Sequence, residues 1–404
     1  MKPLPGRRDL LVLSAGLAVS TAGDAAALVV LLLRLRPAGS GWVAALLAGE
    51  LIPIVVLAGL AGMAVDRFDS RRILAVALTG QAMLAVPLAV TSSPWATVLL
   101  FTGLHALSAV VRPATSKLVP AITGPQSASR GYAAIATGIS LGWIIGPAAG
   151  GLLAGTLGAT TALLVDAVTF AVLAAATSIL RVKTPSSMPS TTDGSRAGGG
   201  FALLWRTPAL RVALVVSATG IGCAVIDNVA APFRFVNQLG ATATSYGLYL
   251  TIWGAGAFLG IQVLPRIRQH RHAVALAAGN LLLGVGIAGI GIAPVLTLAF
   301  VAAGVGGLGN GLTNVAQNAL VARHTPAAQH GRAFAAVAAT NQVAIGVGTA
   351  AASPLVTLLG ANIAMITAGC LTMFAAIGGL IYSTHHKTPS QQPLAAPVKH
   401  SPVN

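Results

Sequence analysis

The sequence predicts an all-α membrane protein with twelve transmembrane helices in two six-helix pseudo-repeat bundles. Three observations predict this class: an apolar composition, twelve long apolar runs, and a second half that repeats the first. Apolar residues make up 55% of the 404 residues and charged residues 8%, whereas a soluble domain carries about 25% charged residues. Most of the surface is therefore expected to face lipid.

Each apolar run is long enough to cross a bilayer, which requires about 20 residues in a helix. The runs cover residues 10–33, 42–63, 73–92, 96–117, 132–157, 161–180, 210–231, 245–264, 273–293, 295–320, 334–358 and 361–382. Short connections join most of them. The two cysteines, Cys223 and Cys370, fall inside runs and are expected to be small core residues, with no disulfide or metal framework.

The apolar pattern divides the chain into two units. Residues 1–180 form the first predicted six-helix bundle and residues 210–382 the second. Between them, residues 181–209 are rich in Ser, Thr, Pro and Gly, which predicts a flexible cytoplasmic linker. Residues 383–404 are polar and predict a disordered cytoplasmic tail.

The two units resemble each other in sequence. Arg130-Gly-Tyr-Ala-Ala-Ile-Ala corresponds to Arg332-Ala-Phe-Ala-Ala-Val-Ala, and Leu157-Gly-Ala corresponds to Leu359-Gly-Ala at the same offset. Chance similarity between Ala- and Gly-rich helices is the alternative, but a shared offset over two separate stretches disfavours it. Parallel repeats of this kind describe a transporter architecture whose substrate site lies at the repeat interface.

The net charge of +16 is distributed as a membrane protein requires. With the N-terminus inside, the outer loops hold Arg34, Arg36 and Arg234, Arg112 lies within a span, and the other Lys and Arg residues lie on the inner side. This positive-inside bias predicts a multi-pass protein of the cell membrane with both termini cytoplasmic. The expected partner of the charge is anionic lipid at the cytoplasmic face, not nucleic acid. A cleaved signal peptide is disfavoured because the first run is too long and contains Asp24.

Acidic residues inside the spans indicate proton coupling. Asp24 is the one charge in run 10–33, and Glu50 interrupts the next run; a carboxylate there costs about 2.5–3.5 kcal/mol on insertion scales. Both lie roughly 12–14 Å from the outer helix ends, so they could share one site, where a low dielectric favours the neutral acid. Asp227 is a shallower candidate, and Asp166 is expected to have an interfacial or capping role. A structural hydrogen bond is the alternative for Asp24.

Polar side chains recur at helical spacing in the fourth and tenth runs. A polar face cannot look at lipid, so these faces are predicted to line an aqueous substrate cavity, with a contribution from the eleventh run. Interhelical hydrogen bonding as packing is the alternative. The predicted cavity residues are His105, Ser108, Arg112, Thr115, Asn310, Asn314, Gln317 and Asn341.

The connection after the second run resembles the signature loop of the major facilitator superfamily, G-x-L-x-D-R-x-G-R-[KR]. It reads Gly62-Met-Ala-Val-Asp66-Arg67-Phe-Asp-Ser-Arg71-Arg72, with Asp and Ser where Gly and Arg are usual. The resemblance implies that Asp66 faces the start of the eleventh helix, a positive dipole end, and latches the cytoplasmic side. Simple positive-inside anchoring is the alternative.

The fifth run contains Gly142-Trp-Ile-Ile-Gly146-Pro147-Ala-Ala-Gly150-Gly151, which resembles the G-x-x-x-G-P-x-x-G-G motif of drug–proton antiporters in that superfamily. Glycines at this spacing clear one helix face so that another backbone can approach, and Pro147 permits a bend. A bare packing face is the alternative.

The segment Arg112-Pro-Ala-Thr-Ser-Lys-Leu-Val-Pro120 resembles the macrolide-efflux and siderophore-exporter-like branch. Many drug–proton antiporters carry an Arg early in the fourth helix, where this chain has His105 and no Arg, so the family's coupling mechanism does not transfer whole.

The predicted activity is proton-coupled efflux of a drug-like or secondary-metabolite compound by alternating access, with an amphiphilic substrate expected from a mostly apolar cavity with few fixed charges. A nutrient or metabolite symporter or uniporter of the same fold is one alternative, and a non-transporting receptor or assembly partner is another. No nucleophile–base pair, metal spacing or nucleotide loop is present in the sequence, so an enzyme and a cofactor are not expected.

Overall fold

All regular structure in the part of the chain that the computed structural model describes, residues 6–182, 197–326 and 329–385, is helical. Twelve of its helical segments are long and apolar enough to cross a membrane. The predicted all-α fold class and number of spans are therefore confirmed, and the chain is a multi-pass membrane protein.

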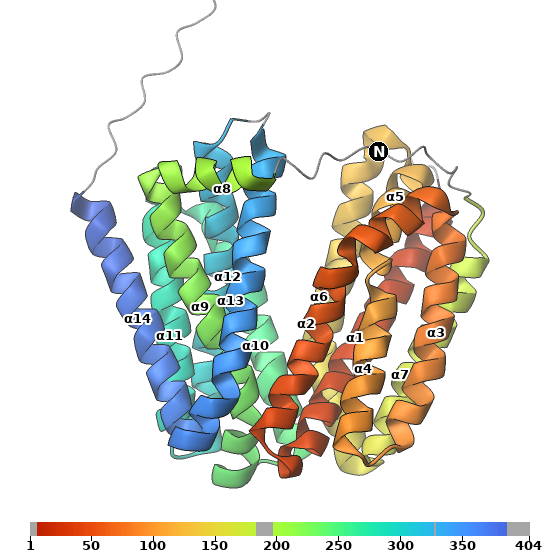
Figure 1. Ribbon diagram of the computed structural model, residues 1–404, viewed down its shortest axis with the longest axis horizontal. Helices are drawn as coiled ribbons and strands as arrows, with labels where there is room; N and C mark the ends of the chain where they lie inside the picture. The colour runs from red at the N-terminus through yellow and green to blue at the C-terminus, as the bar shows by residue number, and fades with distance from the viewer. Residues whose placement is uncertain (1–5, 183–196, 327–328, 386–404) are drawn as a thin grey trace, which may run out of the picture.

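The first six crossings use seven helices, because one crossing is interrupted. These are α1 (Arg7–Leu35), α2 (Ser40–Arg67), α3 (Ser70–Val90), α4 (Pro94–Ser108), α5 (Val111–Thr123), α6 (Ala128–Thr156) and α7 (Ala159–Ser178), with a short 3-10 turn, η1 (Arg36–Ala38), after α1. They form one bundle in Figure 1.

The remaining helices form a second bundle beside the first (Figure 1). They are α8 (Ala197–Arg206), α9 (Pro208–Phe233), α10 (Ala243–Val263), α11 (His272–Ile292), α12 (Leu296–His324), α13 (His330–Leu359) and α14 (Ala361–His385), with a π-helical turn, η4 (Arg234–Gln238), after α9. We call the membrane face that carries the start of α1 and α8 the terminal face, and the face that carries η1 and η4 the far face.

The internal repeat is visible in the backbone. Gly158, between α6 and α7, has φ 89° and ψ 159°, and Gly360, between α13 and α14, has φ 81° and ψ 157°. These two glycines are equivalent at the offset of 202 found in the sequence. A positive φ favours glycine, so both hairpins at the far face use the same residue for the same turn.

An arginine closes the far-face end of the third crossing in each bundle. Arg34 donates hydrogen bonds to the carbonyls of Leu88, Ala89 and Thr91 at the end of α3, at 2.9–3.2 Å. Arg234 donates likewise to the carbonyls of Ile290 and Ala293 at the end of α11. The last carbonyls of a helix have no partner within the helix. These two arginines therefore satisfy helix ends, which explains why they depart from the positive-inside pattern.

Replacing Arg34 with alanine is expected to lower the free energy of unfolding by about 1–3 kcal/mol, because it leaves buried carbonyls without donors. Thermal unfolding of the purified protein in detergent measures the change. Arg8→Ala is the matched control, since Arg8 is exposed on the same helix and its loss is expected to leave the melting temperature unchanged. Equal melting temperatures for the two variants would contradict the capping role.

Two sequence predictions about secondary structure are wrong in detail. The run 96–117 is not one helix: α4 ends at Ser108 and α5 begins at Val111. Pro113 has no N–H to donate to the carbonyl four residues earlier, and its ring clashes with that carbonyl, so the helix breaks at that turn. Within the predicted flexible linker, residues Ala197–Arg206 form α8. The rest of the predicted linker from residue 183 to 196, and the predicted tail from residue 386 onward, lie outside the described residues.

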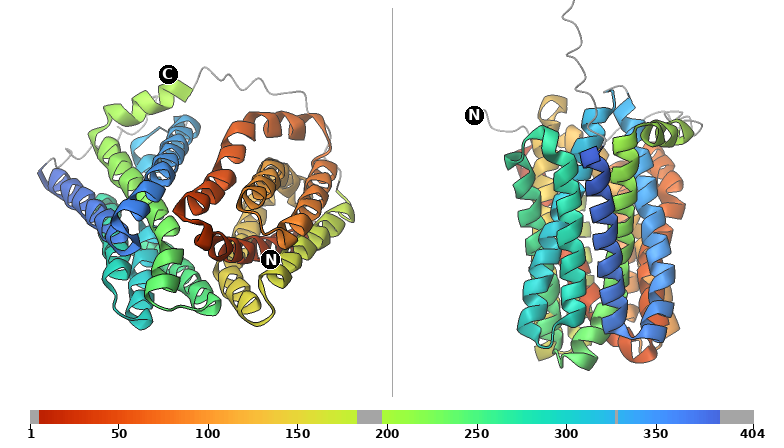
Figure 2. Two further views of the ribbon diagram at one scale, coloured as in Figure 1. Left: turned by 60° about the horizontal axis from the view of Figure 1, so that its bottom comes forward. Right: turned by 90° about the vertical axis from the view of Figure 1, so that its left-hand side faces the viewer.

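Close contacts between the bundles lie in the half of the membrane next to the far face. The Ser40 hydroxyl at the start of α2 hydrogen-bonds Ser353 and Thr357 near the end of α13, and Arg36 donates to Asn237 across the two turns. Gly151 of α6 lies against Gly247 of α10. Toward the terminal face the bundles stand apart in Figure 1, and the left-hand view of Figure 2 shows them side by side.

Candidate functional site

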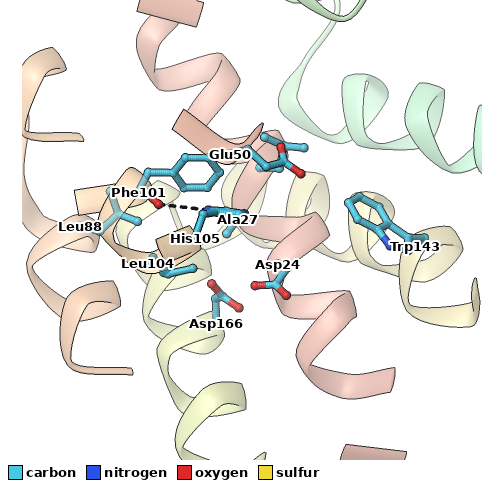
Figure 3. A pocket seen from close by; sticks show the side chains of 10 residues that line it. Asp24, Ala27, Glu50, Leu88, Phe101, Leu104, His105, Trp143 and Asp166 are labelled. Carbon is cyan, nitrogen blue, oxygen red and sulfur yellow. Dashed lines mark hydrogen bonds between the residues drawn. The ribbon is translucent and has the colours of Figure 1, made fainter. Parts of the chain in front are cut away.

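A small cavity lies inside the N-terminal bundle and gathers three carboxyl groups and one imidazole. Its volume is about 70 Å³, enough for a few water molecules but well below the roughly 300–1,000 Å³ of drug-sized pockets. The four polar side chains come from four helices, α1, α2, α4 and α7, with Trp143 of α6 at one side (Figure 3). The lining residues are Asp24, Ala27, Leu28, Glu50, Leu88, Phe101, Leu104, His105, Trp143 and Asp166. We call this site the acid cavity.

The polar groups meet because they lie at similar depths. Asp24 lies 11 residues before the end of α1, Glu50 lies 10 residues after the start of α2, and His105 and Asp166 lie 11 and 7 residues after the starts of α4 and α7. All four distances are counted from the far face and correspond to roughly 10–16 Å of helix. The sequence prediction that Asp24 and Glu50 share a depth thus has a structural counterpart in one cavity.

Asp166 is the one carboxyl or imidazole group of the acid cavity that the sequence analysis did not include among its candidate site residues. Its side chain is 2% exposed, and its carboxylate points toward that of Asp24 in Figure 3. The expected interfacial or capping role is therefore wrong. The sequence contained a feature that could have identified Asp166 as a site residue, because it is the one charged residue in its apolar run.

Gly23 and Thr169 position Asp166. A methyl group on Gly23 would lie less than 3.0 Å from the Asp166 Oδ1 and from the Thr169 hydroxyl. The absence of a side chain at Gly23 therefore lets the carboxyl group approach α1 one residue away from Asp24. The Thr169 hydroxyl lies 2.7 Å from the Asp166 carbonyl oxygen, to which it donates, and 3.3 Å from Oδ1.

His105 lines the cavity and uses one ring nitrogen in a contact with the backbone of its own helix. Its Nδ1 lies 3.1 Å from the Phe101 carbonyl oxygen, which can only accept a hydrogen bond, so we assign the hydrogen to Nδ1. In the neutral ring Nε2 is then the proton acceptor. The ring also packs against Phe101 at a centroid distance of 4.3 Å, which fixes its orientation.

The charge of the lining groups defines what the acid cavity can bind. The lining includes three carboxyl groups and neither lysine nor arginine. Three ionised carboxylates in so confined a space would leave uncompensated negative charge, which is costly away from bulk water. A proton or another small cation relieves that charge. The arrangement is therefore suited to taking up and releasing a proton.

The glycine–proline motif of α6 packs against α1, the helix that carries Asp24. Methyl groups at Gly142, Gly146 and Gly150 would each collide with the backbone of α1, between Ala18 and Ala26. Gly151 points the other way, and a methyl group there would lie 2.5 Å from the Ala243 carbonyl oxygen of α10. Helix α6 thus lies between the helix that carries Asp24 and the opposite bundle.

Comparison with known proteins agrees with this architecture. The sequence profile of the Major Facilitator Superfamily matches residues 10–272 and 212–404. The chain belongs to the Major Facilitator Superfamily. It is accordingly a transporter and not an enzyme, as the sequence analysis predicted.

Curated relatives of this transporter cover most of its length. It is 25% identical over 350 residues to the uncharacterized MFS-type transporter YfiS of Bacillus subtilis, covering 82% of each chain. It is 27% identical over 354 residues to the multidrug efflux pump Tap of Mycolicibacterium fortuitum, covering 81% of this chain and 85% of that protein. Among solved structures, the nucleoside transporter NupG superposes with a TM-score of 0.79 at 13% identity over 92% of this chain and 99% of that one. This last similarity concerns the fold alone.

The signature loop of the transporter makes its ion pair within one bundle. Lys117 of α5 lies 2.6 Å from Asp66 and donates to the Val65 carbonyl oxygen at 3.1 Å. The family resemblance implied a partner at the start of α13, on the other bundle; in this conformation Asp66 instead pairs with Lys117. The sequence analysis did not single out Lys117.

Other residues of the loop organise the start of α3. The Asp69 side chain accepts from the Arg71 backbone N–H at 2.9 Å and caps the helix. The Arg71 guanidinium donates to the Leu180 carbonyl oxygen at 2.6 Å, Arg67 lies over the Phe68 ring, and Arg72 is exposed. Gly62 has open space where a side chain would be.

The side chains of Asp66 and Lys117 are partly exposed, at 30% and 29%, so we expect their ion pair to contribute no more than about 1 kcal/mol to stability. A double-mutant cycle with Asp66→Asn and Lys117→Gln, measured by thermal unfolding, tests this. A coupling energy of several kcal/mol would show that the pair is a structural element of the bundle and not a weak surface pair.

The residues predicted to line a substrate cavity do not form two uninterrupted stripes. His105 belongs to the acid cavity, and the Ser108 hydroxyl donates to the His105 carbonyl oxygen. Beyond the helix break, Arg112 is exposed and Thr115 buried. In the other bundle the Asn314 amide donates to Asn310, and Asn341 of α13 donates to the buried Gln317 of α12 at 3.4 Å. The last contact fits the packing alternative.

Asp227 lies apart from the acid cavity, in the C-terminal bundle. It is 1% exposed, and its Oδ2 accepts a hydrogen bond from the Tyr249 hydroxyl at 2.9 Å. Tyr249 in turn packs against Phe235 and Tyr246. The other oxygen, Oδ1, has no hydrogen-bond partner among the described residues. Asp227 is deeper than predicted because α9 continues past Pro232 into the π-helical turn.

Proposed function

We propose that this transporter exports amphiphilic, drug-like compounds in exchange for protons, and that the acid cavity is its proton site. The observation that carries the proposal is the convergence of Asp24, Glu50 and Asp166 on one cavity without a lysine or arginine among its lining residues. Two further facts support export: the antiporter-type glycine–proline motif, and relatives that carry the name multidrug efflux pump.

The orientation follows from the positive-inside pattern and is part of the proposal. The terminal face carries most of the Lys and Arg residues and is cytoplasmic. The contacts between Ser40 and Ser353 and between Gly151 and Gly247 then close the extracellular side, while the bundles stand apart toward the cytoplasm (Figure 1). The conformation is inward-facing, the state in which an exporter binds substrate and releases a proton.

The proposed cycle alternates charge in the acid cavity. In the inward-facing state, the carboxyl pair of Asp24 and Asp166 releases one proton toward the cytoplasm. The His105 Nε2 is a neighbouring acceptor for that proton. The resulting negative charge favours a substrate with cationic character between the bundles, since the cavity itself is too small for the compound. After the bundles rock to open outward, a proton from outside neutralises the pair, and the substrate leaves.

The test is transport of a lipophilic cationic dye, ethidium, into inside-out vesicles under an imposed pH gradient, the direction that corresponds to export from the cell. We expect transport that stops when a protonophore collapses the gradient. Flux in the same direction as the protons would indicate a symporter, and flux that ignores the gradient a uniporter. Failure to move any compound of a chemically varied panel would favour the receptor alternative.

Asp166→Asn is expected to shift the pH dependence of ethidium export without preventing insertion. A pair of carboxyl groups shares protons differently from an acid beside an amide, so the pH of half-maximal transport changes. The measurement is initial export rate against pH, compared with Thr169→Val, which alters only the hydrogen bond to Asp166. An unchanged pH profile in Asp166→Asn would assign Asp166 a purely structural role.

A further inference from the structure

Helix α8 presents two aromatic side chains that are about half exposed. Phe201 and Trp205 are 49% and 47% exposed, one helical turn apart, and their rings stack at a centroid distance of 5.5 Å. Exposed aromatic side chains at the end of a membrane bundle are typical of the membrane–water interface, where an indole or phenyl ring lies at headgroup level.

An adjacent face of α8 attaches the helix to the C-terminal bundle. Leu204 is fully buried and belongs to a core cluster with Leu210 of α9 and Ala333 of α13. A methyl group on Gly200 would lie less than 3.0 Å from the Arg332 carbonyl carbon and oxygen in the first turn of α13. The buried side of α8 therefore holds the helix in place, while the two aromatic side chains remain about half exposed.

The orientation of α8 fits a helix that lies in the plane of a membrane surface. In Figure 1 it runs across the terminal-face end of the bundle, and in the right-hand view of Figure 2 it projects from the side of the bundle. Thr207 has an extended backbone, and Pro208 begins α9, so the chain turns sharply from the surface into the membrane.

The charge around α8 favours one class of lipid. Arg206, Arg211 and Arg332 lie on or beside the helix, and the first and last of these are exposed. From residue 197 to the end of the sequence the only acidic residue is Asp227, which is buried in the bundle. Between residue 197 and the end of the sequence, these arginines therefore have no exposed acidic side chain to pair with, which suits anionic headgroups.

We propose that α8 is an in-plane membrane anchor, with Phe201 and Trp205 inserted at the headgroup–acyl boundary and Arg206 and Arg211 bound to anionic phospholipid. Helices with an aromatic face and a basic rim bind membranes in this way, and their binding strengthens with anionic lipid content. Because Gly200 packs on the first turn of α13, the anchor also holds the end of a helix that contacts the N-terminal bundle at the far face.

The test uses tryptophan fluorescence of the full-length transporter in phosphatidylcholine proteoliposomes, with and without phosphatidylglycerol. The Trp205 signal is the difference between the wild type and Trp205→Phe. We expect this component to be blue-shifted, quenched by phosphatidylcholine brominated near the headgroup end of the acyl chain, and protected from aqueous acrylamide. Adding phosphatidylglycerol is expected to increase the quenching by brominated lipid.

Matched variants separate the anchor from general effects of charge. Arg206→Gln with Arg211→Gln is expected to abolish the gain from phosphatidylglycerol, whereas Arg268→Gln, on the connection between α10 and α11, is expected to keep it. Unchanged melting temperatures confirm folding. Strong acrylamide quenching of the Trp205 component, without quenching by brominated lipid, would overturn the proposal and indicate a face open to water or to a soluble partner. The result does not depend on any transport assay.

Discussion

Asp24→Asn is expected to abolish proton-driven export while leaving membrane insertion and folding intact. Asparagine has the shape of the neutral acid but cannot take up or release a proton, so the charge of the acid cavity no longer alternates at this position. A pH gradient of one unit corresponds to about 1.4 kcal/mol per proton and supports roughly tenfold substrate accumulation for one-to-one exchange. The variant is expected to accumulate no dye above the level of equal concentrations.

The measurement is ethidium accumulation in inside-out vesicles after an imposed pH step. Counterflow of ethidium between equal pH values is expected to persist, because exchange of bound substrate does not require net proton movement. Asp9→Asn is the matched control, since Asp9 lies on the same helix but outside the acid cavity, where its carboxylate accepts a hydrogen bond from the Arg181 backbone N–H. Gradient-driven accumulation that survives in Asp24→Asn would remove Asp24 from the mechanism.

Gly151→Val is expected to disfavour the conformation that is closed at the far face. A β-carbon at this position would lie 2.5 Å from the Ala243 carbonyl oxygen and 3.0 Å from the Gly247 α-carbon, both in the opposite bundle. Overpacking of this kind costs about 1–3 kcal/mol, which shifts an equilibrium between two states by about 5- to 150-fold. Export is therefore expected to fall, because the inward-facing state is less populated by about the same factor.

Distances between spin labels at Trp95 and Leu298 in a cysteine-free background measure this shift. Both residues are exposed at the far face, the first in α4 and the second in α12 of the other bundle. We expect a longer distance in Gly151→Val and an unchanged distance in Gly59→Val, since Gly59 has open space around its α-carbon. An unaltered distribution in Gly151→Val would show that the contact between α6 and α10 does not control closure.

Composition and hydrophobic run length were sufficient to predict the membrane crossings. An apolar run of about 20 residues has few alternatives in a bilayer, because every backbone polar group there needs an internal partner. The internal repeat was also predictable from the sequence, and the matching backbone dihedral angles of Gly158 and Gly360 agree with it. The break between α4 and α5 was missed because the hydrophobic pattern continues across it, although Pro113 carried the relevant signal.

The acid cavity was predictable only in part. Depth along a helix identified Asp24 and Glu50, because burial of a carboxylate is costly wherever it occurs. The same criterion underestimated Asp166, since depth along one helix does not reveal what the neighbouring helix presents. The approach of Asp166 to α1 depends on Gly23, a pairing between distant segments that one sequence does not display. Helix α8 was missed because its first residues, Ala197 to Gly200, have the composition of a linker.

Proton movement during substrate transport tests the central claim most directly. Proteoliposomes that contain a trapped pH-sensitive dye report whether ethidium export moves protons in the opposite direction. The acid cavity as proton site predicts such a counter-flux in the wild type and in Asp9→Asn, and none in Asp24→Asn. Equal proton counter-flux in Asp24→Asn and the wild type, at matched rates of ethidium exchange, would contradict it.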